Sequence, residues 1–378
     1  MAVQKLEIQQ FIEYAQRYPV LDVRSPGEYI HAHIPGAISF PLFTDQERKV
    51  VGTLYKQRSR QDAIKQGLDF FAPKMRPMVE QVESILAGRQ SPATNASEVG
   101  DHSNTILVHC WRGGMRSGAV AWLLDLYGFN VCSLIGGYKK YRNFVLQELE
   151  KPYPFKILGG YTGSGKTFLL NELKRAGKIT IDLEGIANHK GSAFGALGQP
   201  AQPSQEMFEN LLASELIMAM NALGRKSIDA HTEPVWIEDE SMRIGSVNIP
   251  QPIWNQMRQA QVLFLDIPFE KRLDFLVEQY GSLNTESMIN AIIRISKRLG
   301  GLETKTAINY LLEGNKKASF EGLLHYYDKQ YLKGLNSRPD PDLQVIPLEA
   351  PTVDARVNAA RLLNKNQSIT YSNDTIGN

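Results

Sequence analysis

The chain has 378 residues, with 42 Lys and Arg against 40 Asp and Glu and a formal net charge of +2. This length suits two domains of ordinary size, and the near balance of charge excludes nucleic-acid binding through a strongly basic overall field. The N-terminus lacks the basic start and apolar run of a secretory signal, and no stretch reaches the roughly 20 apolar residues of a membrane span. We therefore expect a soluble cytoplasmic protein without membrane contact, whose two cysteines, Cys110 and Cys132, stay reduced.

Short apolar runs alternate with helical patterns over residues 1–150, which we assign to the first domain. Residues 117–126 have the apolar spacing of a helix. The run at 105–109 delivers Cys110 at its carboxyl end, where ligands bind in open α/β sheets. An α/β domain with a site at this cysteine is therefore predicted, with strands at 20–24, 105–109 and 130–135.

The loop CWRGGMRS, from Cys110 to Ser117, joins the strand at 105–109 to the next helix. Arg112 and Arg116 flank the thiol, and cationic neighbours at a helix N-terminus lower a cysteine pKa and stabilise a thiolate or its persulfide. The competing interpretation, a small buried apolar cysteine, fits Cys132, which has no basic neighbours in its strand. We predict Cys110, Arg112 and Arg116 as catalytic residues.

The order of these segments resembles the rhodanese family. The Asp-Val-Arg strand end at 22–24, the His-Ile-Pro-Gly-Ala turn at 33–37, the cysteine loop and the Gly-Gly-Tyr at 136–138 follow one another as they do there. The resemblance implies that Cys110 carries a transferable sulfur or selenium atom as a persulfide-type adduct. Cys110 and Arg116 have a C-x5-R spacing, which resembles the phosphatases related to rhodaneses and suits a tetrahedral phosphate.

A basic, aromatic insertion at about 45–75 separates the turn from the cysteine strand. It is either an RNA-facing surface, with Arg58 and Arg60 as candidate contacts, or a solvated helical hairpin packed by its aromatic residues. Residues 90–104 are polar and without period, which predicts a surface loop. The prolines of Glu150-Lys-Pro-Tyr-Pro predict a short, stiff linker to the second domain.

The second domain, residues 152–378, begins with the most specific motif in the chain. An apolar strand at 155–158 precedes a G-x-x-x-x-G-K-[ST] phosphate loop at 160–167, and helical spacing follows from 166 to 176. Backbone N–H groups in such a loop surround a phosphate, the lysine adds a charge, and the threonine can hold a metal. The motif predicts a bound di- or triphosphate without saying that it belongs to a nucleotide. The predicted phosphate-binding residues are Gly160, Thr162, Gly163, Ser164, Gly165, Lys166 and Thr167.

Further strands at 179–183, 235–237 and 262–267 alternate with helices, which predicts a parallel sheet with helices on both faces. Candidate site residues follow two of them. Asp182 and Asp239 at strand ends can orient Mg²⁺ or water, although Asp is also frequent in strand-end turns.

Two polar segments are candidates for contact with the phosphates. His189 lies in the glycine-rich segment 187–195, which is either a lid over the phosphates or an ordinary loop. Arg243 follows the acidic strand end and is either a phosphate contact or a surface arginine.

The C-terminal part reads as helices with basic faces over about 268–335. Arg294, Lys297 and Arg298 are candidate RNA contacts, although such charge runs are usually the solvated face of a helix. A last strand is predicted at 343–348, and the tail from Asn364 is expected to be disordered.

Joined in this order, the two halves resemble the tRNA 2-selenouridine synthase family over essentially the whole chain, through CWRGGMRS, GGYTGSGKT, ANHKGSAFG and WIEDESMRIG. The resemblance implies a rhodanese-like α/β domain followed by a P-loop NTPase-like parallel-sheet domain with a helical C-terminal part. It also implies that wobble 2-thiouridine in a tRNA anticodon loop is S-geranylated from geranyl diphosphate and then converted to 2-selenouridine with selenophosphate. No stable protein partner is expected.

Three alternatives remain open. The chain could be a bifunctional P-loop kinase with a rhodanese-type sulfurtransferase or phosphatase domain, or a tRNA sulfurtransferase that activates the base with a nucleotide. It could also be a non-catalytic scaffold, against which the intact Cys110 and Lys166 argue.

Overall fold

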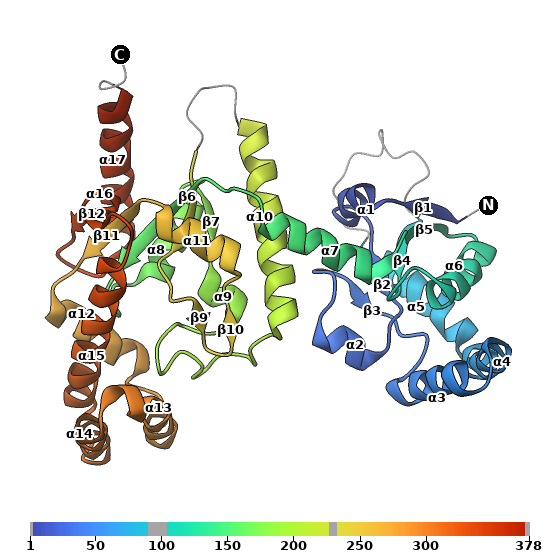
Figure 1. The fold of residues 1–378 in the computed structure, drawn as a ribbon, viewed down its shortest axis with the longest axis horizontal. Helices are drawn as coiled ribbons and strands as arrows, with labels where there is room; N and C mark the ends of the chain where they lie inside the picture. The colour runs from blue at the N-terminus through green and yellow to red at the C-terminus, as the bar shows by residue number, and fades with distance from the viewer. Residues whose placement is uncertain (1–2, 90–103, 227–232, 375–378) are drawn as a thin grey trace. The chain divides into compact units, whose positions relative to one another are not determined.

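The computed structural model describes residues 3–89, 104–226 and 233–374, and it divides into two compact units, Met1–Glu148 and Leu149–Asn378 (Figure 1). Each unit is a parallel sheet covered by helices, so the predicted α/β fold class is confirmed. No helix in the described part of the chain is long and apolar enough to cross a membrane.

The first unit contains a five-stranded sheet in the order β1-β5-β4-β2-β3, in which every pairing is parallel. All residues of β4 are buried, so the loop that carries Cys110 leaves from the middle of the carboxyl edge of the sheet. The strands are β1 (Gln4–Leu6), β2 (Val20–Asp22), β3 (Ile38–Ser39), β4 (Thr105–His109) and β5 (Asn130–Leu134). The helices are α1 (Ile8–Ala15), α2 (Pro26–His31), α3 (Asp45–Gln57), α4 (Arg60–Phe71), the 3₁₀ turn η1 (Ala72–Lys74), α5 (Met75–Ala87), α6 (Met115–Tyr127) and α7 (Gly137–Leu149).

The basic insertion is a helical hairpin of α3 and α4. Thr44 accepts a hydrogen bond from the Glu47 N–H and starts α3, while Phe71 is buried and Phe70 packs edge-on against Phe43. Phe70 and Phe71 therefore pack the hairpin as the second interpretation predicted, whereas Tyr55 is exposed, and Arg58 and Arg60 are exposed at the turn between its helices. Of the surface loop expected at 90–104, residues 90–103 lie outside the described residues.

The second unit contains a five-stranded parallel sheet in the order β12-β11-β6-β8-β7. The first strand of the unit lies in the centre, so chain connections leave it toward both edges, and ligands bind at such a switch point. The phosphate loop follows this central strand. The strands are β6 (Phe155–Gly160), β7 (Ile179–Ile181), β8 (Val235–Glu238), β11 (Val262–Asp266) and β12 (Val345–Glu349), with a small antiparallel hairpin of β9 (Arg243–Ile244) and β10 (Val247–Asn248).

Helices cover the second sheet and extend beyond it. Near the sheet lie α8 (Lys166–Arg175), α9 (Leu183–Ala187), α10 (Gln205–Lys226) and α11 (Gln251–Gln259), and the C-terminal helices are α12 (Phe269–Tyr280), α13 (Thr285–Leu299), α14 (Gly301–Leu312), α15 (Lys316–Asn336), α16 (Pro341–Gln344) and α17 (Ala355–Asp374). The expectation of a disordered tail from Asn364 is wrong for residues 364–374, because α17 continues to Asp374, and the last four residues of that tail lie outside the described residues. Ala359 and Leu362 bury their side chains in a cluster with Leu169 and Leu170 of α8 and thereby hold this last helix on the sheet.

Candidate functional sites

The cysteine loop of the first unit is fixed by the Gly-Gly-Tyr segment that follows β5. The N–H of Tyr138 donates to the carbonyl oxygen of Cys110 at 2.8 Å, and the N–H of Lys139 donates to that of Trp111 at 2.9 Å. A Cβ at Gly137 would lie 2.4 Å from the Cys110 carbonyl oxygen, and its φ is 59°. Only glycine allows this close approach, so Gly137 keeps the loop against the first turn of α7.

The thiol of Cys110 is buried, with 3% of the residue exposed. Burial raises its pKa, but hydrogen bonds from the Ser117 hydroxyl (3.2 Å) and from backbone N–H groups, including that of Gly114 (3.4 Å), outweigh this effect, and the pKa is lowered overall. Local hydrogen bonds therefore favour the thiolate, whereas the sequence had suggested that the flanking arginine charges would do so. Burial raises the pKa of Cys132, which agrees with an inert structural cysteine.

Arg116 forms an ion pair across the site with Glu28 of α2. Its Nη1 lies 2.7 Å from Glu28 Oε2, and Arg48 Nε lies 2.9 Å from the same oxygen. Burial raises the pKa of Glu28, but Arg116, the Ser25 N–H and Arg48 lower it to about 2. Arg112 is exposed. The sequence did not predict Glu28 as part of the site, because its position three residues after Ser25 reads as a helix-capping box, which it also forms.

A buried pair lies beside the cysteine strand. Arg24 Nη2 is 2.6 Å from Asp22 and also donates to the carbonyl oxygen of Ala32. The guanidinium carbon lies 3.8 Å from the centre of the Tyr138 ring. The Asp-Val-Arg strand end therefore supports the tyrosine whose N–H holds the cysteine loop.

The phosphate loop of the second unit has the backbone that its glycines require. Gly163 and Gly165 have φ values of 81° and 73°, in the left-handed region that favours glycine. Lys166 begins α8, and its Nζ donates to the carbonyl oxygen of Gly160 at 3.1 Å. The buried Ser164 hydroxyl has no hydrogen-bond partner in the described part of the chain.

Helix α15 forms one wall of this site, a role that no motif in the sequence indicates. The Tyr331 hydroxyl accepts a hydrogen bond from the Gly160 N–H at 3.1 Å and donates to Asp239 Oδ2 at 2.7 Å. Arg338 Nη2 donates to the other oxygen of Asp239, also at 2.7 Å. Asp239 thus lies at the strand end as predicted, with both carboxylate oxygens already bonded to protein groups.

Three further carboxyl groups lie on the other side of Lys166. The Thr167 hydroxyl donates to Glu184 Oε2 at 2.7 Å, and the Glu184 N–H donates to Glu238 at 2.7 Å. Burial, the largest cause, raises the pKa of all three; repulsion from Asp182 adds to this for Glu184, and repulsion from neighbouring carboxylates, Glu184 included, adds to it for Glu238 and Glu240. The site therefore carries less negative charge beside the phosphates than its sequence suggests. No group of three or more His, Cys, Asp or Glu side chains in the described ranges is arranged to hold a metal ion.

The remaining candidates of the second unit divide between cavity and surface. Asp182 lines the cavity, and its side chain caps α9 by accepting from the Gly185 N–H at 2.7 Å. His189 is buried, which lowers its pKa. The exposed Arg243 donates to the carbonyl oxygen of Gly245 within its own hairpin. Asp182 therefore belongs to the site, whereas Arg243 is a surface residue that does not line the cavity.

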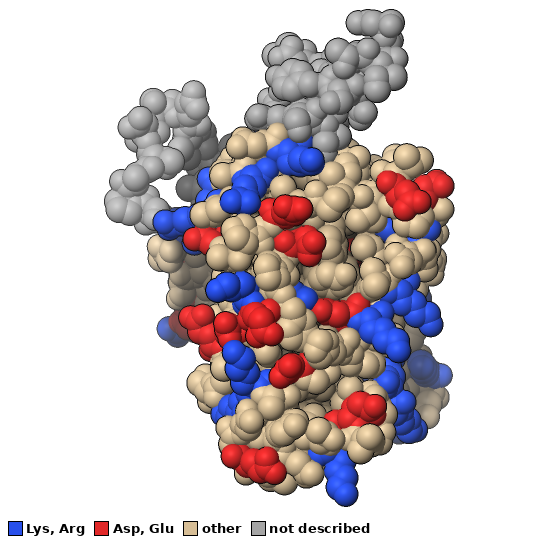
Figure 2. Space-filling model, turned by 90° about the vertical axis from the view of Figure 1, so that its left-hand side faces the viewer, with Lys and Arg blue, Asp and Glu red and all other residues tan. Residues whose placement is uncertain are grey.

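The basic residues predicted on α13 are exposed, and Arg298 also lines the cavity while Arg294 and Lys297 lie on the surface. On the face that Figure 2 shows, Lys and Arg are interspersed with Asp and Glu instead of forming one basic field. Any nucleic-acid contact on that face must therefore be local.

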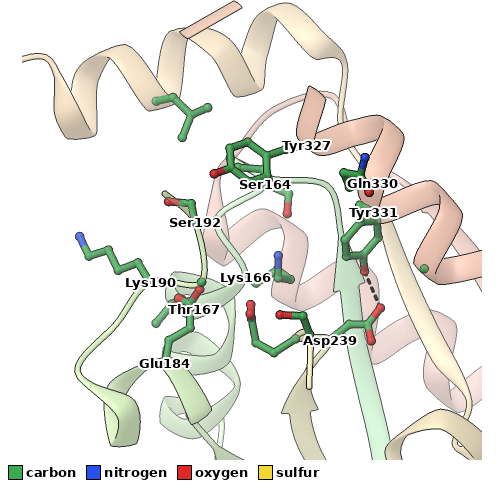
Figure 3. Close-up of a pocket in the computed structure, with 18 of the residues that line it drawn as sticks. Ser164, Lys166, Thr167, Glu184, Lys190, Ser192, Asp239, Tyr327, Gln330 and Tyr331 are labelled. Carbon is green, nitrogen blue, oxygen red and sulfur yellow. Dashed lines mark hydrogen bonds between the residues drawn. The ribbon is translucent and has the colours of Figure 1, made fainter. Parts of the chain in front are cut away.

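The phosphate loop lines a cavity of about 850 Å³. Figure 3 shows Lys166 in the middle of the site, with Lys190 and Ser192 on one side and Gln330 and Tyr331 of α15 on the other. Lys190 and Ser192 belong to the glycine-rich segment predicted as a lid, and this segment contributes to the cavity wall. Both the phosphate loop and that segment therefore line the same cavity.

These two units define a protein that combines a rhodanese-like domain with a P-loop domain. Residues 7–144 match the family model of the rhodanese-like domain, and residues 153–343 match that of the tRNA 2-selenouridine synthase AAA domain. The chain belongs to the tRNA 2-selenouridine synthase family.

Several relatives that bear the name tRNA 2-selenouridine synthase match most of the chain. The Sulfurovum sp. protein is 34% identical over 348 residues, which cover 83% of this chain and 87% of the relative. The Hydrogenovibrio crunogenus protein is 38% identical over 303 residues (75% and 76%), and the Serratia proteamaculans protein is 37% identical over 271 residues (71% and 65%). The similarity therefore spans both units.

Proposed function

We propose that this chain is a cytoplasmic tRNA-modifying transferase that converts wobble 2-thiouridine to 2-selenouridine. In the first step the thiocarbonyl sulfur attacks C1 of geranyl diphosphate, and diphosphate leaves. In the second step selenium from selenophosphate forms a bond to C2 of the base, and the S-geranyl group leaves as geranyl thiol. Family membership, together with a nucleophilic thiol and a phosphate loop in one chain, supports this reaction sequence.

The single observation that favours a prenyl diphosphate is the apolar wall beside the phosphate loop. Phe168, Phe275, Leu276, Tyr280 and Tyr327 line the cavity. A second cavity of about 20 Å³ continues this wall and is lined by Phe194, Phe320, Leu323 and Leu324 as well. Such a surface suits a hydrocarbon chain, while backbone N–H groups and Lys166 suit the diphosphate, whose leaving charge they would stabilise.

A Mg²⁺ ion that assists departure of the diphosphate would have few protein ligands at this site, because the described residues include no group of three or more His, Cys, Asp or Glu side chains arranged to hold a metal ion. The Thr167 hydroxyl and the Glu184 carboxylate are oxygen donors of the kind that Mg²⁺ prefers, and they lie next to the loop. The bound diphosphate and water would supply the other ligands.

For the selenium step we propose that the Cys110 thiolate attacks the phosphorus of selenophosphate, so that an S–P bond forms as the P–Se bond breaks. The selenide released attacks C2 of the S-geranyl base, and water then hydrolyses the S–P bond to free the thiol and phosphate. The lowered pKa of the thiol supports this role, because the thiolate is the reactive form. We propose that Arg116, oriented by Glu28, binds the phosphate of the donor. Arg112 is exposed and free to turn toward the same anion.

The test separates the two steps by nucleoside mass spectrometry of thiolated tRNA incubated with geranyl diphosphate and selenophosphate. Cys110→Ser should abolish formation of 2-selenouridine, and the S-geranyl intermediate should accumulate. A serine hydroxyl is neither acidic nor soft enough to replace the thiolate as nucleophile in the selenium step. Lys166→Ala should stop the route before the intermediate forms. Arg116→Ala should resemble Cys110→Ser, and Cys132→Ser is the matched cysteine control, which should retain both steps.

Two results would contradict the proposal. Loss of geranylation in a correctly folded Cys110→Ser protein would mean that the thiol takes part in the first step. Unchanged binding of geranyl diphosphate by Lys166→Ala in calorimetry would mean that the phosphate loop does not hold the prenyl donor. ATP hydrolysis without tRNA or prenyl donor would instead favour the kinase alternative.

A further inference from the structure

The lining of the cavity at the phosphate loop also includes residues of α11 and of the C-terminal end of α15 that the prenyl donor does not account for, and we call this part of the cavity the second lobe. This lobe lies between α11 and the C-terminal end of α15, and its lining includes Met242, Trp254, Arg258, Gly334 and Leu335. It joins the phosphate loop at Tyr331, whose ring lies 5.7 Å from Lys166 Nζ. A molecule in the lobe would therefore reach the same reacting centre as a molecule on the loop.

The wall of this lobe combines an aromatic ring with a fixed cation. The Arg258 guanidinium carbon lies 5.7 Å from the centre of the Trp254 ring, and Arg258 Nη2 donates to the Gly334 carbonyl oxygen and the Ser337 hydroxyl, each at 3.0 Å. Trp254 is only half-buried, so part of the indole faces the cavity. An indole held beside a guanidinium is a surface on which an unstacked nucleobase stacks.

Gly334 keeps the lobe open. It lies inside the 21-residue helix α15, where glycine is an unfavourable residue. Its φ is not in the left-handed region, and a Cβ built there would meet no heavy atom within 4 Å. Neither the backbone nor the packing of the described residues requires glycine at this position, whereas a ligand in the lobe would need the space.

One polar side chain can read the edge of such a base. Gln330 lies one helical turn before Gly334, lines the cavity and stands next to Tyr331 in Figure 3. Its amide has no hydrogen-bond partner within the described part of the chain. A primary amide offers one acceptor and two donors, which matches the adjacent N–H and C=O of a uracil-type base.

We propose that this lobe is the acceptor subsite and takes one pyrimidine nucleobase splayed out of an RNA strand, with its ring on Trp254 and its edge toward Gln330. The inference rests on the proposed function, in which the phosphate loop holds the prenyl donor. A free nucleotide carries a nucleobase too and could bind the same lobe, so the test compares an RNA stem-loop with a free nucleotide.

The experiment measures binding of an anticodon stem-loop RNA with 2-thiouridine at the wobble position to the full-length protein, without any prenyl donor. Gly334→Leu fills the lobe and Trp254→Ala removes its ring, so each should weaken stem-loop binding by about tenfold or more, as expected for loss of one base–aromatic stack. The matched control is Gly322→Leu on the same helix. A Cβ at Gly322 also meets no heavy atom within 4 Å, but Gly322 does not line the cavity. It should bind the stem-loop like the unmodified protein.

Parallel titrations with geranyl diphosphate and with ATP complete the design. Unchanged affinity for geranyl diphosphate in Gly334→Leu and Trp254→Ala would support a separate acceptor lobe. Equal stem-loop binding by Gly334→Leu and Gly322→Leu would overturn the proposal, and loss of ATP binding instead of stem-loop binding would overturn the RNA source. The stem-loop titration contains no prenyl donor, so it tests the acceptor lobe alone. Geranyl diphosphate binding by Lys166→Ala tests the proposed donor site separately, and the two hypotheses can therefore fail independently.

Discussion

Tyr331→Phe should lower the free energy of unfolding of the second unit, because it removes only the tyrosine hydroxyl and its hydrogen bonds. The ring would remain in contact with Tyr161 and Phe264, whose ring centres lie 5.7 and 6.0 Å from its own. The lost hydroxyl now accepts from the Gly160 N–H and donates to Asp239, which would keep only Arg338. The change therefore isolates two hydrogen bonds from the packing of the ring.

The magnitude follows from what each group loses. A hydrogen bond to a charged acceptor contributes about 1.5–3 kcal/mol, and a buried N–H left without a partner costs about 1–3 kcal/mol. Since the two losses share one hydroxyl and the loop can relax, we expect the free energy of unfolding to fall by about 2–4 kcal/mol. For a unit of this size that lowers the thermal midpoint by roughly 5–15 °C.

The assay is thermal unfolding followed by calorimetry, with and without pyrophosphate. A ligand that binds the phosphate loop raises the midpoint of the second unit and so identifies its transition. Tyr326→Phe is the matched control, because this neighbouring hydroxyl on α15 has no hydrogen bond in the described part of the chain. If Tyr331→Phe and Tyr326→Phe unfold at the same temperature, the tyrosine hydroxyl does not support the phosphate loop and the reasoning fails.

Two further predictions concern the cysteine loop. Ser117→Ala should raise the pKa of Cys110 by about one unit, because a hydrogen bond to the thiolate is lost. The pH dependence of iodoacetamide alkylation in a Cys132→Ser background measures this pKa. An unchanged profile would show that Ser117 does not stabilise the thiolate. Glu28→Gln should lower the free energy of unfolding by about 1–2 kcal/mol at neutral pH, a value reduced for solvent screening. Since folding lowers the pKa of Glu28 from 4.5 to about 2, this contribution is complete above pH 4.5 and disappears as the pH falls toward 2. Urea unfolding at pH 7 and pH 3 measures it, and an equal difference at both values would contradict the ion-pair explanation.

The parts of the two sites that sequence alone predicted are continuous in the chain. The cysteine loop and the phosphate loop are each a strand, a turn and the start of a helix, so glycine positions and apolar spacing identify them without knowledge of the rest of the fold. The structure has β4 directly before Cys110 and α8 beginning at Lys166. In both loops local geometry requires the residues that the motifs contain.

The contacts that sequence did not predict join residues far apart in the chain. Tyr331 is 171 residues from Gly160 and 92 from Asp239, and Glu28 is 88 residues from Arg116. No short-range pattern marks such partners, because they depend on which helix packs beside which strand end. Asp239 illustrates the limit: its position at a strand end was predicted, but its bonds to α15 and Arg338 follow from the tertiary fold.

The C-terminal helices are part of the phosphate site, since one face of α15 contacts three of its components. Tyr327 accepts a hydrogen bond from the Ala193 N–H in the glycine-rich segment at 2.7 Å. Asp328 pairs with Arg272, which donates to the Thr162 carbonyl oxygen in the phosphate loop, and Tyr331 bonds Gly160. Tyr327, Asp328 and Tyr331 lie on one face of a rigid helix and contact the glycine-rich segment 187–195, the phosphate loop through Arg272, and Asp239 at the end of β8, so a shift of α15 would move all three together. Substitutions that break one of these three contacts should therefore alter diphosphate binding even where the substituted side chain touches no ligand.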